Sequence, residues 1–100
     1  MIKHIVFWKL KEQANNLNKE ENALEIKTKL EALNGQIEGL LSLEVGRDFL
    51  GSAESADLVL YSEFESKEAL DYYQNHPLHK AIMPFIGEAR SERRVVDYEV

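Results

Sequence analysis

The stretch IKHIVFWKL, residues 2–10, decides the fold. Branched and aromatic residues dominate it, which predicts a β-strand. Alternate residues of a strand face opposite sides of the sheet, and both sides are apolar at the centre of this one. Ile5 and Phe7 lie on one side, and Val6 and Trp8 lie on the other. A strand that is apolar on both faces is expected to be covered on both sides.

A helix is predicted after this strand. Residues 11–18 are polar and asparagine-rich, and they are expected to form a loop. Asn18 and Glu21 have the spacing of a capping box, which marks the first turn of a helix. Gly35 is the expected stop near the end of this helix. The helix is predicted from an apolar stripe at three- and four-residue spacing, made of Ala23, Ile26, Leu30, Leu33 and Ile37.

Two further strands are predicted in the middle of the chain. They lie within LLSLEVGRDFL (residues 40–50) and DLVLYSEF (residues 57–64), with the polar turn GSAESA (residues 51–56) between them. The second of these is apolar on both faces. In the first, alternation predicts a common face for Leu41, Leu43, Val45 and Phe49.

A second helix begins after Ser66, a residue type that often caps helices, and it meets Pro77. A proline inside a helix lacks the amide donor and clashes with the carbonyl four residues back. We therefore expect a break at His76 and a short helical segment after it. The chain closes with RRVVDYEV (residues 93–100), a predicted strand.

The resulting order is strand, helix, strand, strand, helix, strand. It predicts an α+β fold, the ferredoxin-like βαββαβ arrangement with a four-stranded antiparallel sheet. No repeat or linker interrupts it, so residues 1–100 are expected to form a single domain. The helices can cover only one face of the sheet, and the other face carries large apolar side chains. We therefore expect a homodimer in which two sheets pack face to face, forming a dimeric α/β barrel.

The composition excludes several functions. A net charge of -6 argues against a nucleic-acid partner, which would require a basic surface. The absence of cysteine rules out disulfides, thiolate catalysis and zinc–thiolate sites. The apolar run at the start is too short for a signal or a membrane span. We expect a cytoplasmic protein with no membrane partner.

Three segments together resemble the stress-responsive dimeric α/β-barrel (Dabb) family: IKHIVFWKLKE, YSEFESKEALDYYQNHPLHKA and RRVVDYEV. The resemblance covers essentially the whole chain. It implies the same ferredoxin-like dimer that the order of elements predicts. The family includes a plant polyketide cyclase, a plant stress protein that assembles into large oligomers, and many bacterial members.

The resemblance also implies a site. In the cyclase, the second histidine of the His-Pro-x-His motif and the tyrosine after the aspartate form an acid/base pair, which here correspond to His79 and Tyr72. A histidine and a tyrosine suit proton transfer near neutral pH without a cofactor. The histidine of the first strand, His4, lines the cyclase cavity, and His76 is the first histidine of the motif. We predict Tyr72 and His79 as catalytic residues, and His4 and His76 as substrate-pocket residues.

Structural roles remain alternatives for each of these residues. His79 could hydrogen-bond the preceding loop, Tyr72 could be a core residue, and His76 could cap the segment that follows it. A metal site formed by His4, His76 and His79 is disfavoured, because residues 72–87 supply no carboxylate to complete it and the helix is broken between two of the histidines.

The first functional hypothesis is therefore a homodimer that binds a small apolar or aromatic molecule, with cofactor-free proton transfer as its chemistry. One alternative is a stress-associated protein whose function is assembly itself. A weaker alternative is a small monooxygenase of the same architecture.

Overall fold

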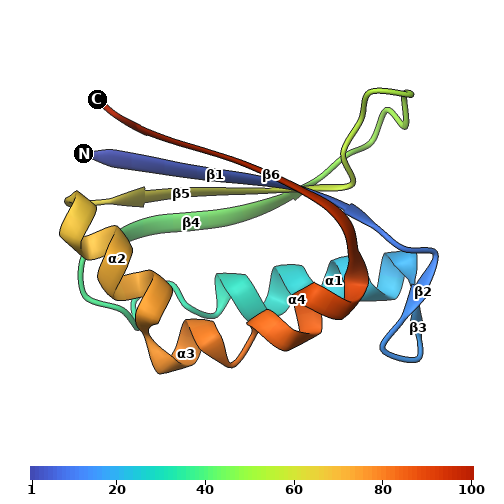
Figure 1. Cartoon of the computed structure of the whole chain (residues 1–100), viewed down its shortest axis with the longest axis horizontal. Coiled ribbons are helices and arrows are strands. Elements are labelled where there is room, and N and C mark those ends of the chain that lie inside the picture. Colours follow the sequence, from blue (N-terminus) through green and yellow to red (C-terminus); the bar gives the residue numbers. More distant parts are fainter.

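The computed structural model describes all 100 residues and has two layers, a four-stranded sheet and a layer of helices on one of its faces (Figure 1). The sheet is antiparallel, with strand order β4-β5-β1-β6. The elements are β1 (Ile2–Leu10), β2 (Gln13–Ala14), β3 (Leu17–Asn18), α1 (Lys19–Glu31), β4 (Leu40–Arg47), β5 (Leu58–Phe64), α2 (Lys67–Asn75), α3 (Pro77–Lys80), α4 (Met83–Ala89) and β6 (Arg90–Glu99). This arrangement confirms the predicted ferredoxin-like fold. None of the helices has the length and apolar character needed to cross a bilayer.

The segment predicted as a loop between β1 and α1 contains a small hairpin instead. β2 and β3 pair through two residues each, and Asn15 and Asn16 form the turn with φ of 55° and 60°. Asparagine tolerates this left-handed conformation better than most residues, and two such residues in succession suit a tight hairpin turn. Composition suggested only a polar loop, so the turn geometry was missed.

The predicted capping box of α1 is present. The side chain of Asn18 accepts a hydrogen bond from the backbone of Glu21, and the Glu21 carboxylate accepts one from the backbone of Asn18. The whole predicted apolar stripe is buried. Its last two members, Leu33 and Ile37, lie beyond the end of the helix at Glu31, so the stripe is longer than the helix.

The predicted common face of β4 is wrong at two positions. The register shifts between Leu40 and Ser42, so Leu40 and Leu43 are both buried and Leu41 is 51% exposed. This irregularity inserts an extra residue, which reverses the alternation. Phe49 lies beyond the end of the strand at Arg47 and is 97% exposed.

The other strands have two distinct faces. On the face toward the helices, the even-numbered residues of β1 and β5 are buried, and they form the core with α1, α2 and α4. On the opposite face, no element of the chain covers the sheet (Figure 1). We call this the open face; it carries Ile5, Phe7, Val59, Tyr61, Val96 and Tyr98, which neighbour one another across β5, β1 and β6.

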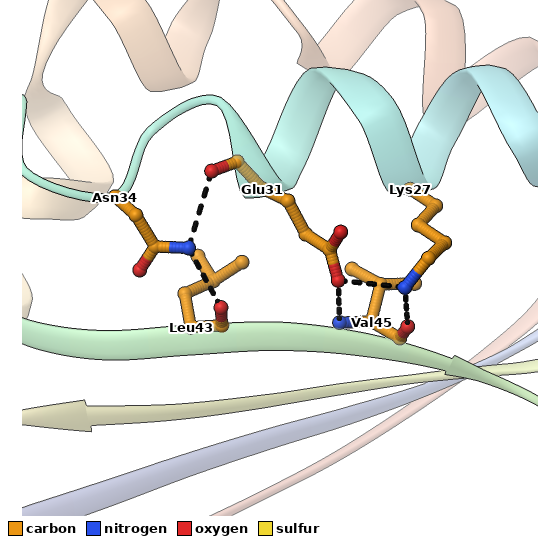
Figure 2. Close-up of polar contacts among 5 residues, drawn as sticks. All are labelled: Lys27, Glu31, Asn34, Leu43 and Val45. Carbon is orange, nitrogen blue, oxygen red and sulfur yellow. Dashed lines mark hydrogen bonds and ion pairs between the residues drawn. The ribbon is translucent and has the colours of Figure 1, made fainter.

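Side chains of α1 and the following turn protect the edge strand β4 (Figure 2). The Glu31 carboxylate accepts the backbone N–H of Val45 at 3.0 Å, and the Lys27 ammonium donates to the Val45 carbonyl at 2.7 Å. The Asn34 amide donates to the Leu43 carbonyl at 2.8 Å. These contacts occupy backbone groups that a second strand would need, so this edge is closed to strand addition.

Candidate functional site

A cavity of about 270 Å³ lies on the helix-facing side of the sheet. Residues from β1, β5 and β6 line it on one side, and residues from all four helices line it on the other. Slightly more than half of its 13 lining residues are hydrophobic. The polar or hydrogen-bonding side chains among them are those of His4, Trp8, Tyr73, Gln74, His79, Arg90 and Arg93. An apolar cavity with a few convergent polar groups is the usual form of a small-molecule site.

Tyr73 is placed in this cavity by α2. It lies one helical turn after Ala69, which packs against the core. Its side chain is fully buried, and its hydroxyl has no hydrogen-bond partner within the chain. Burial raises the pKa of this phenol above its usual range, because a phenolate would be poorly solvated here. The hydroxyl therefore stays protonated, and its hydrogen is not used by any other group of the chain.

His79 reaches the cavity from the short helix α3. Proline begins this helix, and the backbone N–H of Leu78 donates to the side chain of His76, the residue that caps it. The Nδ1 atom of His79 lies 3.2 Å from the Gln74 carbonyl oxygen. A carbonyl only accepts hydrogen bonds, so Nδ1 carries the proton and Nε2 keeps its lone pair in the neutral ring.

The pKa of His79 is lowered, chiefly because burial disfavours the charged ring. The positive charges of His4, when protonated, and Arg93 lower it further, while the bond to Gln74 acts in the opposite direction. At neutral pH the ring is therefore neutral, which is the form that can accept a proton.

His4 forms the third ring of the site. It is 3% exposed, and its Nδ1 is hydrogen-bonded to the Asp97 carboxylate of β6. That carboxylate fixes the orientation of the ring. The Tyr73 ring lies between the two histidines, with centroid distances of 6.5 Å to His4 and 4.4 Å to His79. The structure therefore brings these three side chains together.

Tyr72 does not lie in this cavity. It is 52% exposed, and its ring packs against that of His76, with centroids 5.5 Å apart. Successive helix residues differ by about 100° around the axis, so Tyr72 and Tyr73 cannot share a direction. The predicted placement of Tyr72 beside His79 is therefore wrong, and the tyrosine beside His79 is Tyr73. The spacing of four residues from Ala69 could have indicated this.

His76 also lies outside the cavity, contrary to its predicted place in the pocket. Its side chain accepts the hydrogen bond that starts α3, so its observed contacts are those of a helix cap. His4 and His79 do line the cavity, as predicted. Trp8 was predicted only as a core residue, but its indole N–H is buried without a partner in a side chain that lines the cavity.

The fold and this cavity together define a class: a ferredoxin-like α+β protein with a cavity between its sheet and its helices. A sequence model of the stress responsive A/B barrel domain (Dabb) matches residues 2–100. The chain belongs to this family.

Several solved structures share the fold. A dimeric protein of unknown function from Bacteroides fragilis is 32% identical, with 99% of this chain and 95% of that chain covered and a TM-score of 0.86. A Dabb family protein from Mesorhizobium loti is 24% identical, with coverages of 99% and 95% and a TM-score of 0.73. A hydroxynitrile lyase from Passiflora edulis is 17% identical, with coverages of 99% and 92% and a TM-score of 0.82, which shows a common fold alone. No curated protein sequence matches the chain.

Proposed function

We propose that this protein binds a small molecule in the cavity and transfers a proton from and to a carbon atom beside a carbonyl group, with no cofactor. One observation carries this proposal. A buried tyrosine hydroxyl without a partner and a histidine with a lowered pKa lie side by side in the same cavity. Perturbed titratable groups in a cavity are typical of functional sites.

The chemical step uses His79 as the base. The lone pair of its Nε2 takes the proton from the carbon next to the carbonyl. The electrons of the broken C–H bond form a C=C bond, and the carbonyl π electrons move to the oxygen, giving an enolate. The proton on His79 then returns to the same carbon or another atom, so the step needs no oxidant or reductant.

Tyr73 has the second role in this proposal. Its hydroxyl remains protonated in the cavity and can donate to the oxygen where negative charge develops. His4 acts as a positioning residue, since the Asp97 carboxylate fixes it and its ring packs edge-on against Tyr73. The resemblance to the polyketide cyclase supports a histidine–tyrosine pair of this kind, and we assign its tyrosine to position 73. The hydroxynitrile lyase supports the proposal only as an enzyme with this fold.

Exchange of carbon-bound protons for deuterium tests this proposal. In deuterium oxide, NMR can follow the exchange of the protons next to the carbonyl of 1-phenylpropan-2-one, a small aromatic ketone. We expect the protein to accelerate this exchange. Tyr73→Phe is expected to slow it by about 10- to 100-fold, the effect of losing one hydrogen bond to a charged oxygen.

Tyr72→Phe is the matched control, because it removes the same hydroxyl one residue away and outside the cavity. It is expected to leave the rate unchanged. Equal effects of the two substitutions, or no acceleration by the wild-type protein, would contradict the proposed role of Tyr73.

We also infer that two chains form a homodimer through the open face. This face presents neighbouring apolar side chains, including Phe7 and Val96, which are both exposed in a single chain. The related protein from Bacteroides fragilis is dimeric, as is a ferredoxin-like protein from Thermobifida fusca. Light scattering at micromolar concentration is expected to give twice the mass of the chain, and the mass of a single chain would contradict this inference. Larger assemblies would instead favour the alternative function in assembly.

A further inference from the structure

The charge of the cavity differs from that of the whole chain. The chain contains 18 acidic and 12 basic residues, yet no aspartate or glutamate lines the cavity. Two arginines and two histidines do line it. The single nearby carboxylate with a role in the site, that of Asp97, is bound to His4. A ligand in this cavity therefore meets a surplus of hydrogen-bond donors and positive charge.

Arg90 and Arg93 have no acidic partner within 4.0 Å. Both belong to β6, and both are exposed, so they lie on the solvent side of the cavity. Arg93 is the cross-strand neighbour of Trp8. A guanidinium group binds a carboxylate through two parallel hydrogen bonds, which makes an unpaired arginine beside a cavity a suitable anchor for one.

Two buried donors add to this arrangement. The indole N–H of Trp8 and the hydroxyl of Tyr73 are both buried and have no hydrogen-bond partner within the chain. A buried polar group without a partner is destabilising, so such groups are rare and usually have a functional explanation. Both side chains line the cavity, and a ligand with oxygen acceptors would satisfy them.

We propose that the ligand is a small organic acid, whose carboxylate binds Arg93 and Arg90 and whose apolar or aromatic body lies against the hydrophobic wall of the cavity. The Trp8 and Tyr73 donors then bind further oxygen atoms of the same molecule. The volume of about 270 Å³ lies slightly below the usual range of about 300–1,000 Å³ for ligand pockets, so the acid is small. This inference rests on the proposed function and names the class of molecule that the site takes.

The test compares small aromatic and aliphatic acids with their neutral amides, beginning with benzoate and benzamide. The chain has one tryptophan, so its indole N–H gives a single NMR signal that reports binding at the cavity. Benzoate is expected to shift this signal and to bind at least about tenfold more tightly than benzamide, since a bond to a charged group exceeds a neutral one. Arg93→Gln is expected to weaken benzoate binding more than benzamide binding and so to remove most of this preference.

Arg94→Gln is the matched control, because Arg94 follows Arg93 in β6 and lies beside Phe7 on the open face. It is expected to leave both affinities unchanged. Gly87→Leu provides a steric test: Gly87 lines the cavity, and an added Cβ there would meet no atom within 4 Å. We expect the larger side chain to weaken the binding of acid and amide alike.

The results separate this inference from the proposed function. If amides bind as tightly as acids, or if Arg93→Gln and Arg94→Gln have the same effect, the proposal that the ligand is an acid is contradicted. Binding of a small molecule in the cavity would still stand. If no acid or amide moves the Trp8 signal at millimolar concentration, or if Gly87→Leu has no effect, binding in the cavity itself is contradicted. Failure of the exchange reaction with retained acid binding would contradict the chemistry alone.

Discussion

Replacing His79 with alanine is expected to slow proton exchange in 1-phenylpropan-2-one by about 10²–10⁴-fold, the usual contribution of a general base. His79 is the cavity histidine whose Nδ1 is engaged by the Gln74 carbonyl, which leaves Nε2 as its free basic atom. Alanine cannot accept the proton, and no carboxylate lines the cavity to replace it. NMR in deuterium oxide, with the variant at equal concentration, measures this loss.

His76→Ala is the control for this substitution. It removes the other histidine of the same motif, which lies outside the cavity and caps α3. It is expected to lower the free energy of unfolding by about 1 kcal/mol, as the loss of a cap does, and to leave the exchange rate nearly unchanged. If His76→Ala slows exchange as much as His79→Ala, the assignment of the base is wrong.

Replacing Gly39 with alanine is expected to lower the free energy of unfolding by about 2–4 kcal/mol. Gly39 has a φ of +87°, which costs other residues about 1 kcal/mol or more. An added Cβ would also lie 2.6 Å from the Cβ of Ala69 in α2, and overpacking of this kind costs about 1–3 kcal/mol. Thermal unfolding should show a loss of about 10–20 °C in Tm.

Gly35→Ala separates the two causes. Gly35 has a φ of +76°, but a Cβ there would meet no atom within 4 Å. This substitution is therefore expected to cost about 1 kcal/mol, the backbone contribution alone. Equal losses at the two glycines would show that α2 does not depend on its close approach to Gly39. That approach matters for the site, because α2 carries Tyr73.

Most of the fold follows from patterns that act locally. Alternation in β1 and β5, the capping box at Asn18 and the proline after His76 each fix one element, and the order of elements then leaves few arrangements. The strand β4 was predicted less well, because a single irregularity near Leu41 reverses which side chains face the core. Nothing in the residue types at that point distinguishes a regular strand from an irregular one.

The site was predicted in part, and the reason lies in the geometry of α2. Two of the three predicted histidines were correct, since β1 directs His4 toward the helices and the motif places His79 after the break, whereas His76 caps α3 outside the cavity. The sequence indicated the wrong tyrosine, because two adjacent tyrosines differ by about 100° in direction and the contacts of the helix decide which one is buried. Trp8 and Tyr73 lack hydrogen-bond partners within the chain because of how the interior packs around them, and no local sequence pattern describes that packing.

The pH dependence of wild-type exchange tests most directly whether a buried, neutral His79 is the base. The pKa of His79 is lowered from the ordinary histidine value of 6.5, so the reactive neutral form predominates above the lowered pKa and is lost as the pH falls through it. The rate measured with His79→Ala is subtracted first. The remaining rate is expected to rise with pH, to reach half its maximum below pH 6.5, and to level off at its maximum at higher pH. A midpoint above pH 6.5, or a rate that falls as the pH rises through this range, would contradict this account of the site.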